Sequence, residues 1–90
     1  MTKSPDGWKK ESGYNLNSDG QVIKYKKENE NVQVLTEASA DEDVGKLEYI
    51  TFYENGDNTK IVNKTYNKEE ALDFMHQVME DGIENVNTSW

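Results

Sequence analysis

Apolar residues fall in short clusters along the chain, separated by polar segments rich in Asn, Asp and Gly. Alternation of apolar and polar residues within the clusters is typical of strands that bury one face. The first cluster is anchored by Trp8 and predicts a short edge strand, and the fourth is the richest in β-branched and aromatic residues. The predicted strands are Gly7–Ser12, Val22–Lys26, Val32–Glu37, Lys46–Glu54 and Thr59–Tyr66.

Two of the polar segments carry the signal of tight turns, at Asp19-Gly20 and at Asn55-Gly56. Asp-Gly and Asn-Gly pairs favour hairpin turns because these residues adopt positive φ angles at low cost. The segment Ala38–Gly45 is instead predicted to be an acidic loop. Short connections between consecutive strands predict an antiparallel meander.

The pattern becomes helical near the C-terminal end of the chain. Asn67 stands where an N-cap is expected, and Glu70, three residues later, completes a capping box. Gly82 is placed to end the helix. Apolar residues at helical spacing share one side of the predicted helix. They are Ala71, Leu72, Phe74, Met75, Val78 and Met79.

Strands followed by one helix predict an α+β fold, in which an antiparallel meander of four to five strands packs on one C-terminal helix. One amphipathic helix covers one face of such a sheet, so two layers are expected. With 90 residues, the default is a single small domain spanning residues 1–90. Its ordered core is expected at about 7–83, between a flexible N-terminal arm and a flexible C-terminal tail.

The charge of the chain narrows the classes of partner. Eighteen acidic and ten basic residues give a net charge of −8, and all the basic residues are lysines. The acidic field repels nucleic acid and anionic membranes, and bidentate arginine contacts with phosphate or guanine are missing, so duplex binding is not expected. A basic protein partner fits this charge better, although charge alone also keeps a small domain soluble.

The sequence also predicts a location. The polar start, Met1–Glu11, does not resemble a signal peptide, and no apolar stretch approaches the length of a membrane span. The expected location is therefore the cytoplasm.

Catalytic and metal-binding patterns are weak. The chain has no cysteine and one histidine, His76, so cysteine nucleophiles and disulfides are excluded. Asn15–Gly20 resembles the start of a calcium loop, but the twelfth position is Lys26 rather than glutamate. Asp73 and His76 have carboxylate–histidine spacing, yet such sites need ligands from further helices. We therefore expect no enzyme, no cofactor and no metal site, with a weak cation site at Asp73 and His76 as a lesser alternative.

Both faces of the fourth strand carry large apolar side chains, although one helix buries only one face. Ile50 and Phe52 alternate with Tyr49 and Tyr53. If Ile50 and Phe52 pack on the helix, then Tyr49, Tyr53 and the neighbouring Tyr66 line an open face. Exposed tyrosines are favoured in protein interfaces and also stack on unpaired bases. The alternative is that the N-terminal segment crosses the sheet and covers them.

The second candidate surface is the acidic run Asp41, Glu42 and Asp43, which adjoins the fourth strand. Such a run is usually only solvated, but it also imitates the phosphates of nucleic acid. Together the two surfaces predict a non-enzymatic protein-interaction or regulatory module, a nucleic-acid mimic in one version, whose partner is a basic protein or a second copy. The alternative function is a small-ligand or single-stranded nucleic-acid binder on a tyrosine-lined face.

Overall fold

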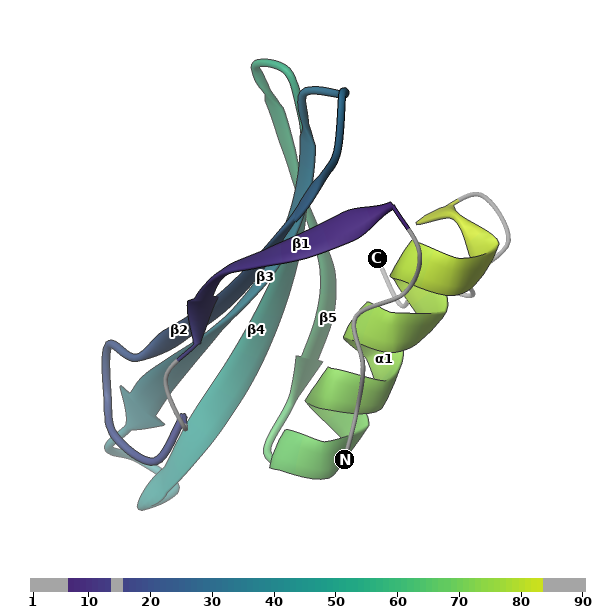
Figure 1. Cartoon of the computed structure of the whole chain (residues 1–90). Coiled ribbons are helices and arrows are strands. Elements are labelled where there is room, and N and C mark those ends of the chain that lie inside the picture. Colours follow the sequence, from purple (N-terminus) through teal and green to yellow (C-terminus); the bar gives the residue numbers. More distant parts are fainter. Residues whose placement is uncertain (1–6, 14–15, 84–90) are drawn as a thin grey trace.

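The structure, a computed structural model, describes residues 7–13 and 16–83. Five strands form one antiparallel sheet in the order β1-β2-β3-β4-β5, and one helix, α1, packs on it (Figure 1). The predicted α+β meander with a C-terminal helix is confirmed, whereas the predicted tail and nearly all of the predicted arm lie outside the described residues. The elements are β1 (Trp8–Gly13), β2 (Val22–Lys27), β3 (Val32–Asp41), β4 (Lys46–Asn55), β5 (Asn58–Thr65) and α1 (Lys68–Asp81).

Strand β3 is longer than the sequence predicts. It pairs with β4 in unbroken register from Val32 opposite Asn55 to Asp41 opposite Lys46. The prediction of a loop over Ala38–Gly45 is therefore wrong for residues 38–41, because β4 supplies a pairing partner to each of them. Only the turn after Asp41 remains outside the strands.

The connection between β1 and β2 is bound to the end of β3. Gly20 donates its N–H to the carbonyl of Ala38 at 2.8 Å, and the Asp19 carboxylate accepts a hydrogen bond from the N–H of Ala40 at 2.7 Å. Leu16, in the same connection, is fully buried in the core, a role that the sequence analysis did not assign. The start of the calcium-loop pattern, Asn15, lies outside the described residues.

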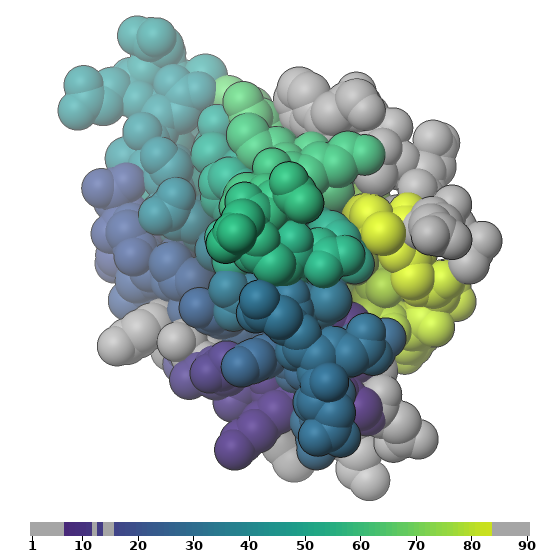
Figure 2. All heavy atoms as spheres, turned by 90° about the horizontal axis from the view of Figure 1, so that it is seen from above, coloured from purple at the N-terminus to yellow at the C-terminus, as the bar shows by residue number. Residues whose placement is uncertain are grey.

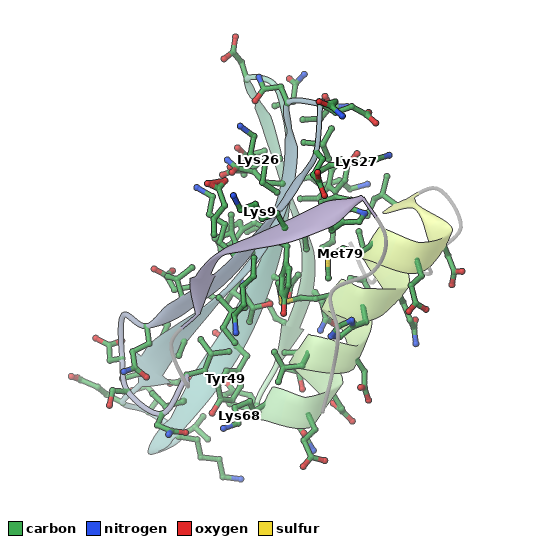
Figure 3. All side chains as sticks on the ribbon, viewed as in Figure 1. Lys9, Lys26, Lys27, Tyr49, Lys68 and Met79 are labelled. Atoms are coloured by element: carbon green, nitrogen blue, oxygen red, sulfur yellow. The ribbon has the colours of Figure 1, made fainter. Side chains whose placement is uncertain are left out.

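Helix α1 begins and ends at the predicted residues. The Asn67 side-chain oxygen accepts a hydrogen bond from the N–H of Glu70 at 3.2 Å. Gly82 has a φ of 83° and donates its N–H to the carbonyl of Val78 at 3.0 Å, as a helix-ending glycine does. The buried side of the helix carries Ala71, Met75, Val78 and Met79, and Figure 3 places Met79 between the helix and the sheet.

The core lies between α1 and one face of the sheet, the covered face. In β3 the buried residues are Val34, Thr36 and Ala38, and the register places them opposite Tyr53, Thr51 and Tyr49. The hydroxyls of Thr36 and Thr51 hydrogen-bond each other at 2.8 Å, which satisfies the two buried polar groups. The buried cluster consists of Trp8, Leu16, Ile23, Val32, Val34, Ala38, Tyr49, Ala71, Met75, Val78 and Met79.

The expectation that Tyr49 and Tyr53 line an open face is wrong. Tyr49 is 9% exposed and belongs to the buried cluster, and Tyr53 packs against that cluster. The physical reason is the β3–β4 register, which puts both tyrosines on the side that carries the buried residues of β3. Ile50 and Phe52 consequently project from the opposite face.

The sheet has two ends that differ in their connections. At one end the β2–β3 and β4–β5 turns lie side by side, and Gly56 donates its N–H to the carbonyl of Asn31 at 2.9 Å (Figure 2). At the other end the β3–β4 turn lies near the β5–α1 connection. There the Lys68 ammonium donates to the Asn17 side-chain oxygen at 3.2 Å.

Candidate protein-interaction surface

The face of the sheet opposite α1, the helix-free face, carries apolar side chains from three strands. Leu35 lies opposite Phe52, Phe52 lies opposite Ile61, and Ile50 is the next residue of β4 on this side. Leu35, Ile50 and Phe52 are half-buried, and Ile61 is 37% exposed. In the part of the chain that the structure describes, the only helix lies against the other face (Figure 1). We call Leu35, Ile50, Phe52 and Ile61 the apolar patch.

Tyr66 extends the apolar patch toward the β3–β4 turn. The preceding residue, Thr65, pairs with Tyr49 of the covered face, so strand alternation directs Tyr66 to the helix-free face. Its side chain is 44% exposed, and its hydroxyl donates a hydrogen bond to Asp41 Oδ2 at 2.6 Å. Because Asp41 belongs to β3 and Tyr66 follows β5, the phenol reaches across β4. Of the three predicted surface tyrosines, Tyr66 is the one on this face.

The hydrogen bond between Tyr66 and Asp41 shifts both groups away from neutral pH. Acceptance by the carboxylate, together with desolvation and nearby negative charge, raises the pKa of Tyr66 to about 12. The same hydrogen bond lowers the pKa of Asp41 below its ordinary value, and a backbone N–H from Asp43 at 3.1 Å adds to this effect. A neutral phenol and a charged carboxylate therefore form a fixed pair, and neither exchanges protons near neutral pH as a general acid or base does.

The β3–β4 end of the helix-free face is acidic. The segment from Asp41 to Glu48 contains four carboxylates and one lysine, Lys46. Glu42 and Asp43 are exposed, and a shallow hollow of about 310 Å³ lies beside the turn. The structure thus brings the three predicted acidic residues together with Tyr66, and it leaves the other two predicted tyrosines on the covered face.

The β1–β2 side of the same face is basic, a feature that the sequence analysis missed. Lys9 and Lys26 lie directly opposite each other, and Lys24 projects on the same side. Figure 3 shows Lys9 and Lys26 on the side of the sheet away from α1. Among the described residues, no ion pair engages these three ammonium groups, although like charges opposite each other destabilise paired strands. The sequence does contain a signal for this basic side, because β1 and β2 hold five of the ten lysines.

The remaining lysine of β2 faces the covered side. Lys27 forms an ion pair with Glu30 at 3.2 Å, and its ammonium lies 5.9 Å from the centre of the Trp8 ring. Its charge is therefore engaged within the chain, in contrast to Lys9, Lys24 and Lys26.

Asp73 and His76 lie on a flank of α1 that faces β2. They line a hollow of about 440 Å³ together with Tyr25 and Glu69, and the His76 and Tyr25 rings are 6.2 Å apart at an angle of 57°. A search of the described residues finds no group of three His, Cys, Asp or Glu side chains that could hold a metal ion. The contact with Tyr25 gives His76 a packing role.

Comparison of the chain with protein-family models, with curated proteins and with solved structures finds no match. Within the described residues, no helix combines the length and the apolar character that crossing a membrane requires. The geometry and charge of the helix-free face are therefore the observations that bear on function.

Proposed function

We propose that this protein is a non-enzymatic protein-interaction module that binds another polypeptide through its helix-free face. The observation that carries the proposal is the apolar patch on a face that α1 does not cover. Phe52 and Tyr66 add aromatic rings to it, and aromatic side chains are enriched in protein interfaces. Contiguous apolar surface of this kind marks interaction sites on soluble proteins.

The surroundings of the apolar patch support a protein as the partner. Lys24 and Lys26 flank it on one side, and Glu37 and Glu48 flank it on the other. An apolar centre inside a charged rim is the usual arrangement of a protein interface, and the rim charges orient the partner.

Binding of unpaired bases receives less support from this geometry. That alternative required a platform of three tyrosines, and Tyr49 is buried under α1. The net charge of −8 also opposes attraction to a nucleic-acid backbone. The idea of phosphate mimicry by Asp41, Glu42 and Asp43 stays a prediction, which a triple substitution to Asn, Gln and Asn tests through loss of a nucleic-acid-binding partner.

The test compares variants of the apolar patch with a matched variant outside it. Phe52→Gln and Ile61→Glu alter the patch, whereas Val44→Glu changes an apolar residue that is 50% exposed in the β3–β4 turn. Each tagged variant is expressed in the cells that make the protein, and the co-purified polypeptides are quantified by mass spectrometry. Circular dichroism confirms that each variant is folded.

We expect the patch variants to lose their polypeptide partner about thirtyfold, since truncating a central interface residue costs about 2 kcal/mol. The Val44→Glu variant should retain the partner. Equal recovery by all folded variants, or recovery of no polypeptide by the wild type, would contradict the proposal.

A further inference from the structure

Opposite charges occupy the two ends of the helix-free face. Lys26 of β2 and Lys9 of β1 lie toward the β2–β3 turn, and Lys24 lies opposite Leu35, beside the apolar patch. Glu48 of β4 and Asp41 of β3 lie toward the β3–β4 turn, where Lys46 lies opposite Asp41. We call these two groups the basic end and the acidic end. Glu54 is the carboxylate of β4 nearest the basic end, and it accepts a hydrogen bond from Gln33.

The apolar patch lies between the two charged ends. Along β3, Leu35 comes after the position opposite Lys26 and before Glu37, and along β4, Ile50 and Phe52 lie between Glu48 and Glu54. A line from the basic end to the acidic end therefore crosses the region of Leu35, Ile50 and Phe52. From either end, the order along this line is a charged group, then apolar surface, then a group of the opposite charge.

A surface with this order is complementary to itself. A two-fold axis that lies in the interface and crosses the apolar patch turns a second copy over, so that its acidic end meets the basic end of the first. The same operation brings the first copy's acidic end to the second copy's basic end, because a two-fold interface repeats each contact. The two apolar patches meet around the axis and are removed from water together.

We infer that the polypeptide bound by the helix-free face is a second copy of this chain, held in a two-fold dimer. This inference rests on the proposed function and adds the identity of the partner. A partner with only basic residues would satisfy the acidic end and bring no carboxylate to Lys9 and Lys26, which share a hollow with Glu11 and Glu28 of their own chain. A second copy supplies carboxylates to the lysines and lysines to the carboxylates in one docking.

A dimer interface of ordinary size would occupy a modest share of the surface of this chain. A specific interface buries about 800 Å² on each partner, which is roughly one eighth of the accessible surface of 5976 Å². Strands β3 and β4 each have ten residues, so the face is about 33 Å long at about 3.3 Å per residue. Burial of the apolar patch drives association, and the charged ends set the orientation.

The test reverses the charge of one end at a time. Lys24→Glu with Lys26→Glu makes both ends acidic, and Asp41→Lys with Glu48→Lys makes both ends basic. The control is Glu69→Lys with Glu80→Lys, at two exposed positions of α1. It changes the net charge by the same amount as the variant that reverses the acidic end. Sedimentation velocity over a concentration series gives the dimer dissociation constant of each folded protein and of an equimolar mixture of the first two variants.

We expect a dimeric wild type and a dimeric Glu69, Glu80 control. Each end-reversed variant should dissociate at least tenfold more readily, and mixing the two variants should restore a dimer that contains one copy of each. This rescue occurs only if the basic end of one copy meets the acidic end of the other.

A wild type that stays monomeric at millimolar concentration would overturn the dimer. A dimer that is insensitive to both reversals, or a mixture without rescue, would overturn it as well. These results leave the proposed function standing if Phe52→Gln still abolishes co-purification of a different polypeptide. If no patch variant changes any association, both the dimer and the proposed function fail.

Discussion

The two faces of the sheet use the same strands in different ways. On the covered face, β4 contributes Tyr49 and Thr51 to a core closed by α1, and the hydroxyl of Thr51 is paired with that of Thr36. On the helix-free face, the same strand contributes Ile50 and Phe52, which are half-buried and meet no helix among the described residues. Strand β4 therefore places large apolar side chains on both faces, and Ile50 and Phe52 are on the side that is left open.

Which face of a sheet is buried depends on all of its strands together. In β3 the covered side carries Val34 and Ala38, whereas the other side carries Gln33, Glu37 and Ser39 around a single leucine. Because neighbouring strands share each face, the small and apolar side of β3 commits the tyrosines of β4 to the core. Ile50 and Phe52, on the other side of β4, are then left outside this core.

The largest expected contrast is between substitutions in the core and on the open face. Met75→Ala removes a side chain that is 1% exposed, and we expect it to lower the free energy of unfolding by about 2–5 kcal/mol. Ile61→Ala on the helix-free face should cost less than about 1 kcal/mol. Denaturant unfolding with a constant slope measures both values. Equal losses would contradict the conclusion that the covered face contributes more to stability than the helix-free face.

The buried threonine pair should behave as a unit. Thr36→Val or Thr51→Val alone leaves one buried hydroxyl without a partner, at an expected cost of about 1–3 kcal/mol. The double variant should recover most of this loss, since two apolar groups of similar shape then face each other. A double-mutant cycle in denaturant measures the coupling, and additive losses would show that the hydroxyls do not interact.

Substitution of the N-cap residue should change stability without changing binding. Asn67→Ala removes the acceptor of the Glu70 N–H, and we expect a loss of about 1 kcal/mol. Asn67→Asp should restore the stability, because aspartate caps as well as asparagine. At temperatures where the protein is folded, neither variant should weaken association through the helix-free face. A parallel loss of binding would mean that α1 itself contacts the partner.

The smallest expected effect on stability concerns Tyr66. Its pKa is raised to about 12 from 10.0, so the stabilising contribution of its neutral form is complete below pH 10 and is lost as the pH rises toward 12. Asp41 has a lowered pKa, so its contribution is present above its ordinary pKa of 3.8 and is lost as the pH falls through the lowered value. Tyr66 is exposed and Asp41 is half-buried, so we expect small changes in the free energy of unfolding.

NMR titration of the Tyr66 ring carbon measures this pair directly. In the wild type the ring should titrate near pH 12, and in Asp41→Ala its pKa should fall toward the ordinary value of 10.0. Glu48→Gln is the matched control, because Glu48 acts on Tyr66 only through its charge, and it should produce a smaller shift. An unchanged titration in Asp41→Ala would mean that the hydrogen bond is absent in solution.

Local signals in the sequence were sufficient to predict the strands, the helix and their order along the chain. The Asn67 cap, the Gly82 end and the Asn55-Gly56 turn all lie at the predicted places. The end of β3 was missed because Ala38, Ser39 and Ala40 carry little strand signal and are ordered by pairing with β4. Leu16 was missed because its burial depends on how a connection folds back over the core, which no local pattern describes.

The candidate surface was predicted only in part. Tyr66 and Asp41 are brought together, but the aromatic partner from β4 is Phe52 rather than the two tyrosines. Which side of β4 faces the core depends on its register with β3, and the sequence of β4 alone does not reveal it. The basic end was readable from the lysines of β1 and β2, whose alternation places Lys24 and Lys26 on one side.

The most direct test of the helix-free face as a binding surface uses two adjacent residues of β4. A photoreactive benzoylphenylalanine is placed at Phe52, on the helix-free face, or at Tyr53, on the covered face, and the protein is irradiated in the cells that make it. We expect position 52 to form adducts between polypeptides and position 53 to react within its own chain. Adducts between polypeptides from position 53, or equal yields from both positions, would show that the helix-free face is not the binding surface.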